Sequence, residues 1–242
     1  MRTLTNDRFA PITSSPGFLK LPFHSGVDHF VAWHRRLHPR VDVKFVEGFP
    51  ECLRLLEPLT VTCAPRVALV EVKGGWTAYF DCHWHGTDTG SPIGYLPIQA
   101  HCEGISIATI PHTLTPDGRH GRRGARTFTL YADHDVAWLN VVRSISLVYE
   151  ARWRFDTLGD PLPFEEVEKY SSRLSRDKFT SAMIERYCKA LGLDVFNESA
   201  YGPRAAIITS AVGCGPNSIR GSLEDCQREY PIAPDEADRM PG

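Results

Sequence analysis

Two apolar runs separated by a pair of glycines dominate the pattern of the chain. Residues 67–72 and 76–82 are rich in β-branched and aromatic side chains, and Lys73, Gly74 and Gly75 lie between them. Glycine reaches positive φ without a Cβ clash, so a Gly-Gly pair between two strand-like runs is typical of a tight β-hairpin. The pattern therefore predicts a central hairpin over 66–88.

The second run of this hairpin alternates between two kinds of side chain. Because successive residues of a strand point to opposite faces, one face is apolar and the other polar. The apolar face, which we interpret as core, carries Trp76, Ala78, Phe80 and Cys82. The polar face carries Thr77, Tyr79, Asp81, His83 and, at its end, His85.

Helical periodicity is clearest near the C-terminus. Thr180 is placed as an N-cap before an apolar stripe at helical spacing, and Gly192 provides the positive φ of a helix end. A more charged helix over 164–176 precedes it. The two segments predict a helical hairpin over 164–192 that packs on the sheet.

The remaining segments add shorter elements. A helix is predicted over 25–38, a short helix begins at Ser91, and strands are predicted over 41–45, 59–63, 104–110, 127–131 and 205–212. Over 133–156 the pattern fits either two strands or a helix followed by a strand. We favour a helix to about Arg143 or Leu147 and then a strand over 151–156.

These elements predict an α+β fold with a mainly antiparallel sheet, because the regular strand–helix alternation of parallel folds is absent. Residues 25–212 form the single predicted domain. The proline-rich residues 1–24 are interpreted as an extended arm, and the Gly-, Pro- and charge-rich residues 213–242 as a flexible tail.

Composition narrows the classes of function. The chain has 242 residues, 42% of them hydrophobic and 23% charged, with a net charge of −2, which is typical of a globular domain. A dedicated nucleic-acid or membrane-surface binder would carry a strong basic excess. The seven cysteines form no C-x-x-C pair, and the first residues resemble no signal segment. We therefore expect a cytoplasmic protein whose cysteines, Cys63 included, are reduced and pack as small apolar groups.

The end of the second hairpin strand offers a candidate metal site. Asp81, His83 and His85 stand two residues apart, and Asp88 follows. The D-x-H-x-H run resembles the one that ends the first barrel strand of amidohydrolase-type metal enzymes, where two imidazoles hold a divalent metal that activates water. The resemblance covers five residues and implies a hydrolase using zinc or manganese. The alternative is a polar strand end without metal, because the repeated units of a (β/α)8 barrel are absent.

A basic, glycine-rich loop provides a second candidate. Residues 115–126 carry Arg119, Arg122, Arg123 and Arg126, whose guanidinium groups match phosphate and carboxylate oxygens. An ordinary solvated loop tip is the alternative interpretation. The loop lacks the G-x-x-x-x-G-K-[ST] pattern of a phosphate cradle.

These observations lead to three hypotheses of function. The first is a binding or regulatory protein without a cofactor or a defined catalytic step. It recognises a protein or a small anionic ligand through Tyr79, Trp84 and the four arginines, because aromatic and guanidinium groups dominate interaction sites. The second is the metal-dependent hydrolase. The third is nucleic-acid or phosphate-ligand binding through the 119–126 loop.

Overall fold

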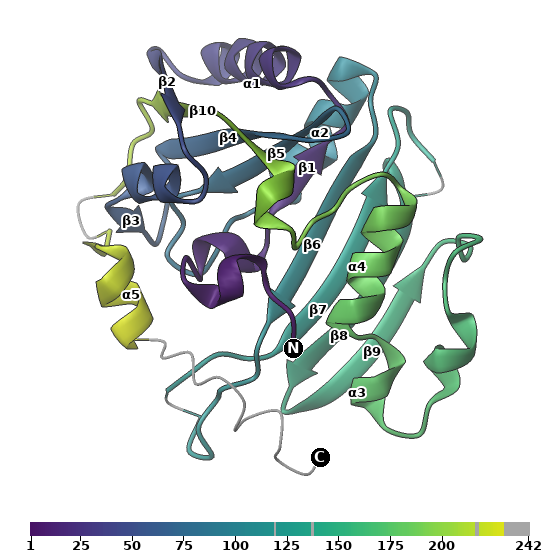
Figure 1. The fold of residues 1–242 in the computed structure, drawn as a ribbon. Coiled ribbons are helices and arrows are strands. Elements are labelled where there is room, and N and C mark those ends of the chain that lie inside the picture. The colour runs from purple at the N-terminus through teal and green to yellow at the C-terminus, as the bar shows by residue number, and fades with distance from the viewer. Residues whose placement is uncertain (119, 137, 216–217, 230–242) are drawn as a thin grey trace.

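The computed structural model describes residues 1–118, 120–136, 138–215 and 218–229. Within these residues nine strands form one sheet in the order β2-β10-β4-β5-β1-β6-β7-β8-β9, and every neighbouring pair is antiparallel. The predicted α+β fold with a large antiparallel sheet is confirmed (Figure 1).

The bounds of the strands show which segments build the sheet. They are β1 Gly17–Leu19, β2 Val41–Glu47, β4 Arg66–Val72, β5 Trp76–Asp81, β6 Gly104–Ile110, β7 Ala125–Tyr131, β8 Val141–Glu150, β9 Arg152–Leu158 and β10 Tyr201–Ser210. A second, two-stranded sheet pairs β3 Leu59–Thr60 with β11 Arg220–Gly221.

Helices cover both faces of the large sheet (Figure 1). One face is packed by α1 Phe23–Leu37 and α2 Gly90–Ala100, and the other by α4 Ser181–Ala190 and η3 Glu51–Leu56. The shorter helices are η1 Leu4–Asp7, η2 Ile12–Ser14, η4 Val167–Ser171, α3 Ser175–Lys178, η5 Glu198–Ala200 and α5 Leu223–Glu229. No helix among the described residues is long and apolar enough to cross a bilayer.

The predicted central hairpin is present. Gly74 and Gly75 both have positive φ and close the turn between β4 and β5, whose register runs from Val67 opposite Asp81 to Val72 opposite Trp76. A Cβ on Gly74 would stand 2.8 Å from the carbonyl oxygen of Gly192, so glycine is also needed for close packing there. However, β5 is a central strand between β4 and β1, and its predicted polar face is buried as well.

The helical hairpin is only partly regular. Thr180 caps α4 as expected, because its side chain accepts a hydrogen bond from the backbone N–H of Met183. The first arm, predicted as one helix over 164–176, consists of the short helices η4 and α3 instead.

The helix favoured over residues 133–147 is wrong. Residues 141–158 form the β8–β9 hairpin, and Ala151 at its turn has positive φ. Burial alternates residue by residue along β8 from Val141 to Leu147, so the period of two decides the structure.

The N-terminal residues also differ from the predicted arm. β1 lies between β5 and β6 in the middle of the sheet, and Phe9, Ile12 and Phe18 are part of the core. Residues 1–24 are thus an integral part of the fold. In the predicted tail, α5 buries Leu223 and Cys226, whereas 216–217 and 230–242 lie outside the described residues.

One cysteine pair corrects the expectation of free thiols. Cys63 and Cys214 form a disulfide with a Cα–Cα distance of 5.6 Å. The other five cysteines, Cys52, Cys82, Cys102, Cys188 and Cys226, are buried thiols, as expected of small apolar residues.

Candidate functional site

Asp81, the centre of the predicted metal site, is buried with 1% of its surface exposed. Its Oδ1 accepts the backbone N–H of His83 at 2.9 Å, and its Oδ2 accepts the backbone N–H of Asp88 at 2.9 Å and the hydroxyl of Tyr79 at 3.2 Å. Burial raises the pKa of Asp81 to about 7, and these hydrogen bonds limit the rise. Both oxygens are therefore engaged in holding the 82–88 turn.

The other residues of the D-x-H-x-H run do not converge on Asp81. The imidazole centroids of His83 and His85 lie 5.9 Å apart, and the Nδ1 of His83 accepts the backbone N–H of His85. Asp88 uses Oδ1 to cap the backbone of Gly90 at the start of α2. Among the described residues no three His, Cys, Asp or Glu side chains gather as a metal-binding group.

The two aromatic residues predicted for recognition lie inside the protein. Tyr79 packs in the core beneath α1, at a centroid distance of 5.8 Å from Phe30. Trp84 is buried under the C-terminal segment, where a Cβ on Gly221 would meet its ring at 2.9 Å and the thiol of Cys226 donates to its carbonyl oxygen. Neither side chain is exposed to a partner.

The arginines of the basic loop divide into buried and exposed groups. Arg122 is buried and donates to the hydroxyl of Ser14 at 3.0 Å, and Arg126 is buried with its guanidinium 5.3 Å from the ring centroid of Trp153. Arg123 is exposed, and Arg119 lies outside the described residues. Of the three described arginines, Arg123 has the exposure that ligand binding needs.

Arg123 lines a cavity of about 780 Å³ that we call the arginine pocket. This volume falls within the range of roughly 300–1,000 Å³ typical of small-molecule sites. Four guanidinium side chains line it, from three separate parts of the chain: Arg123, Arg152, Arg173 and Arg176. No aspartate or glutamate belongs to its described lining.

Aromatic side chains from β8, β9 and the residues just after β6 form another part of the lining. The imidazole of His112 lies 3.9 Å from the ring of Tyr149 and 5.7 Å from that of Trp153, measured between centroids. Gly124 is required beside them, because a Cβ there would stand 2.5 Å from Trp153. The pocket thus combines planar apolar surfaces with positive charge.

Three of the four charges in the pocket are not compensated by carboxylates. Within the part of the chain that is described, Arg123, Arg152 and Arg173 have no ion-pair partner. Arg154, two residues beyond Arg152 on β9, is ion-paired with Glu150 at 3.0 Å and does not line the pocket. Uncompensated guanidinium groups in a concave site favour an anionic ligand.

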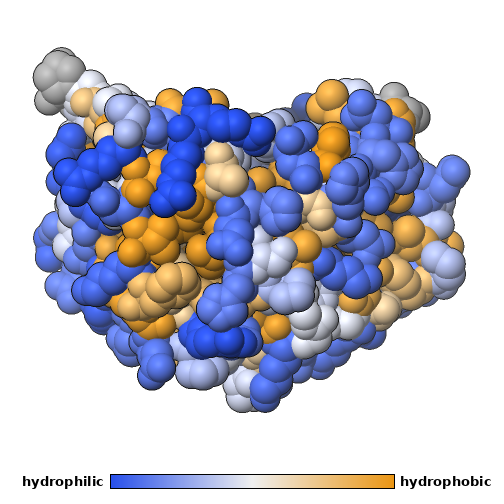
Figure 2. All heavy atoms as spheres, turned by 90° about the horizontal axis from the view of Figure 1, so that it is seen from above, coloured by the Kyte–Doolittle hydropathy of each residue, from blue (hydrophilic) through white to orange (hydrophobic). Residues whose placement is uncertain are grey.

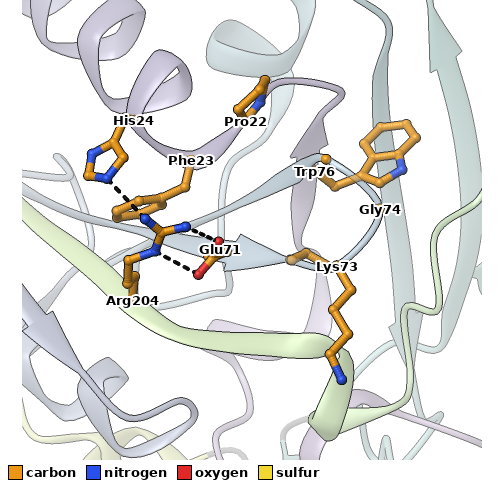
Figure 3. A pocket seen from close by; sticks show the side chains of 10 residues that line it. Pro22, Phe23, His24, Glu71, Lys73, Gly74, Trp76 and Arg204 are labelled. Carbon is orange, nitrogen blue, oxygen red and sulfur yellow. Dashed lines mark hydrogen bonds and ion pairs between the residues drawn. The ribbon is translucent and has the colours of Figure 1, made fainter.

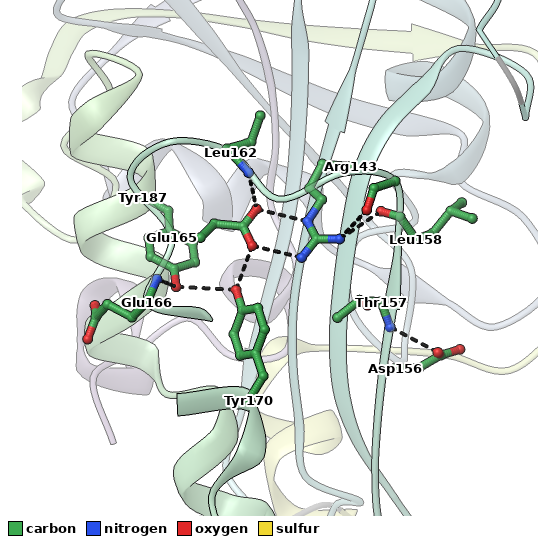
Figure 4. Close-up of polar contacts among 10 residues, drawn as sticks. Arg143, Asp156, Thr157, Leu158, Leu162, Glu165, Glu166, Tyr170 and Tyr187 are labelled. Carbon is green, nitrogen blue, oxygen red and sulfur yellow. Dashed lines mark hydrogen bonds and ion pairs between the residues drawn. The ribbon is translucent and has the colours of Figure 1, made fainter. Parts of the chain in front are cut away.

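A buried ion pair holds residues 165–170, the stretch that precedes Arg173 and Arg176 in sequence (Figure 4). The guanidinium of Arg143 on β8 makes two parallel contacts to Glu165, at 2.8 and 2.7 Å, and the two side chains are only 2% and 0% exposed. Tyr170 donates to the same carboxylate at 2.7 Å. Burial raises the pKa of Glu165, but the hydrogen bonds outweigh it, so the pKa lies below its usual value.

A second cavity, of about 250 Å³, lies beside the Gly74-Gly75 turn. Figure 3 shows Arg204 directed at Glu71, with Lys73 pointing away from this pair. Arg204 binds Glu71 through two hydrogen bonds and donates to the Nε2 of His24 at 3.1 Å. Because the guanidinium is already neutralised, this cavity offers less to an anion than the arginine pocket does.

In comparisons with known proteins, no protein-family model, no curated protein and no solved structure matches the chain.

Sequence reasoning identified Arg123 but missed most of the arginine pocket. Arg152, Arg173 and Arg176 lie 29 or more positions beyond it in the printed sequence. The one local signal is the alternation of arginine with aromatic residues over 152–155.

Proposed function

We propose that the chain is a binding protein that holds a small organic anion in the arginine pocket. The observation that carries this proposal is the set of four arginines lining one cavity whose described lining contains no carboxylate. Guanidinium forks pair with phosphate or carboxylate oxygens in two parallel hydrogen bonds, which gives both affinity and orientation.

The aromatic lining and the size of the cavity refine the ligand class. Inorganic phosphate would fill little of about 780 Å³. Trp153, Tyr149 and His112 add apolar and polarisable surface, which suits a planar ring carried by the anion. The ligand proposed is therefore an aromatic phosphate or carboxylate.

The other hypotheses have less support. Recognition through Tyr79 and Trp84 would need exposed side chains, and both are buried. A zinc- or manganese-dependent hydrolase would need Asp81 to release its backbone hydrogen bonds to His83 and Asp88. A cytoplasmic location stays a prediction, and the Cys63–Cys214 disulfide weighs against it because disulfides are rare in reducing compartments.

Calorimetric titration with three probes tests the proposal: a nucleoside monophosphate, the corresponding uncharged nucleoside, and inorganic phosphate. The monophosphate should bind more tightly than either of the others, because only it offers both a ring and an anion. R152A/R173A should weaken its binding by roughly 10-fold or more, since each charge-assisted hydrogen bond contributes about 1.5–3 kcal/mol.

R154A is the matched control, because Arg154 lies on the same strand but pairs with Glu150 outside the pocket. It should leave the affinity for the monophosphate unchanged. Equal affinity for the monophosphate and the nucleoside would contradict the role of the arginines. Equal loss of binding in R154A and R152A/R173A would show that the anion binds elsewhere.

A further inference from the structure

β2 is an open edge of the large sheet. It pairs with β10 on one side, in continuous register from Val41 opposite Ser210 to Glu47 opposite Arg204, and it is the first strand in the sheet order (Figure 1). Neither a proline nor a register shift interrupts it. Such an edge presents a row of backbone N–H and C=O groups that another strand can bind.

β9 is the opposite edge strand, and α3 packs against it, with Lys178 5.6 Å from the ring centroid of Phe155. At either edge, the exposed side chains decide whether a further strand is accepted.

The side of β2 that faces α1 carries exposed apolar surface. Phe45 is 59% exposed and lies 6.3 Å from Phe23, measured between ring centroids. Val41 and Val43 are half-buried on the same side, and Leu37 at the end of α1 is 57% exposed. Figure 2, a view from the α1 side, shows apolar side chains gathered between hydrophilic ones.

The other side of β2 carries opposite charges on neighbouring positions. Asp42 and Lys44 are both exposed and stand two residues apart, on either side of Val43. In an antiparallel pair of β2 strands centred on Val43, position 42 of each strand lies opposite position 44 of the other. The charges of the two strands are therefore complementary. Reversal about Val43 brings each acid opposite a base.

We propose that β2 pairs with β2 of a second copy of this chain, antiparallel and centred on Val43. In this register Asp42 faces the partner's Lys44 twice, once for each chain, and Val41 faces the partner's Phe45 twice. A register centred on Lys44 would place two lysines opposite each other, which is unfavourable. The isologous contact would join the two sheets into one.

The expected association is weak, because a five-residue ribbon with a few apolar neighbours is smaller than a standard interface. Sedimentation velocity at about 10 to 200 µM should show a concentration-dependent monomer–dimer equilibrium. A monomer at every concentration would overturn the proposal.

Charge reversal tests the register. D42K places lysine opposite lysine, and K44D places aspartate opposite aspartate, so each variant alone should be monomeric. D42K/K44D restores opposite charges and should dimerise like the original chain. A mixture of the two single variants should form heterodimers, because positions 42 and 44 are then both basic in one chain and both acidic in the other.

A folding control and the outcome of the mixture keep this test interpretable. Asp42 also accepts a hydrogen bond from Arg40 at 2.8 Å, so far-UV circular dichroism and melting curves are needed to show that D42K is folded. If the original chain dimerises but the mixture of single variants does not, the dimer uses another surface and the β2 register is rejected. If the single variants are monomeric but their mixture forms heterodimers, the β2 register is supported.

Discussion

At the scale of single residues, a buried carboxyl group organises the turn after β5. Asp81 accepts three hydrogen bonds, two from the backbone of the 82–88 turn and one from Tyr79. Thr87 reinforces the turn, because its hydroxyl accepts the backbone N–H of Asp81 and donates to the carbonyl of Ile12. The polar groups that resemble a metal site thus satisfy backbone groups in a buried turn.

The raised pKa of Asp81 predicts a pH dependence of stability. Burial moves the pKa from 3.8 to about 7, so the folded protein binds this proton more tightly than the unfolded chain does. The contribution of Asp81 to the free energy of unfolding is therefore largest below about pH 4 and falls as the pH rises to about 7, by at most about 1.4 kcal/mol per pH unit.

D81N provides the comparison, because the asparagine side chain does not titrate. Urea unfolding of both proteins between about pH 4 and about pH 8 should show the stability advantage of the original chain over D81N shrinking as the pH rises. An advantage that grows with pH would mean that the hydrogen bonds lower the Asp81 pKa instead.

The Arg143–Glu165 pair makes a second prediction at this scale. E165Q should destabilise the protein by about 3–5 kcal/mol in urea unfolding, because it leaves the buried guanidinium of Arg143 without its carboxylate. R143M/E165L removes both charges and should lose less stability than E165Q. A larger loss in the double variant would mean that apolar groups cannot fill this site, whatever the charges contribute.

At the scale of elements, local sequence patterns predict those segments whose structure is determined by neighbouring residues. The Gly74-Gly75 turn, the cap at Thr180 and the strand β6 over Gly104–Ile110 each depend on a few neighbouring residues, and all three are present in the structure. The alternation of β5 was also predicted, but burial of its polar face depends on α1, which packs on that face from elsewhere in the chain.

The β8–β9 hairpin is a segment where local patterns do not decide between helix and strand. Val136, Leu139 and Val142 stand at helical spacing, and the same stretch alternates from residue 141 onward. Pairing with β7 on one side and β9 on the other satisfies the backbone of β8, and this gain arises only when the sheet assembles. Tertiary context therefore selects the strand.

The arginine pocket is an extreme case of the same limit. Its basic side chains come from the 111–124 loop, the start of β9 and residues 173–176 around the start of α3. Each arginine alone is typical of an ordinary surface charge, and only the fold brings them together. Most of the candidate site could not be predicted from sequence for this reason.

At the scale of the whole molecule, the two ends of the chain complete the structure. Near the N-terminus, β1 joins β5 to β6, so the sheet is continuous only because residues 17–19 are inserted. Near the C-terminus, β11 pairs with β3, and α5 covers Trp84. Gln227 on α5 donates to the carbonyl of Ala10 at 2.7 Å, which links the two ends.

The Cys63–Cys214 disulfide joins positions 151 residues apart in sequence and holds the start of this C-terminal covering. Because a long loop is closed, C63S/C214S should lower the free energy of unfolding by about 2–4 kcal/mol. Reductant should destabilise the original chain and leave the double variant unchanged. Thiol titration of denatured, unreduced protein should count the five free cysteines. A count of seven would show that the bond does not form, and β11 and α5 would then be held by β3, Trp84 and the Gln227–Ala10 hydrogen bond.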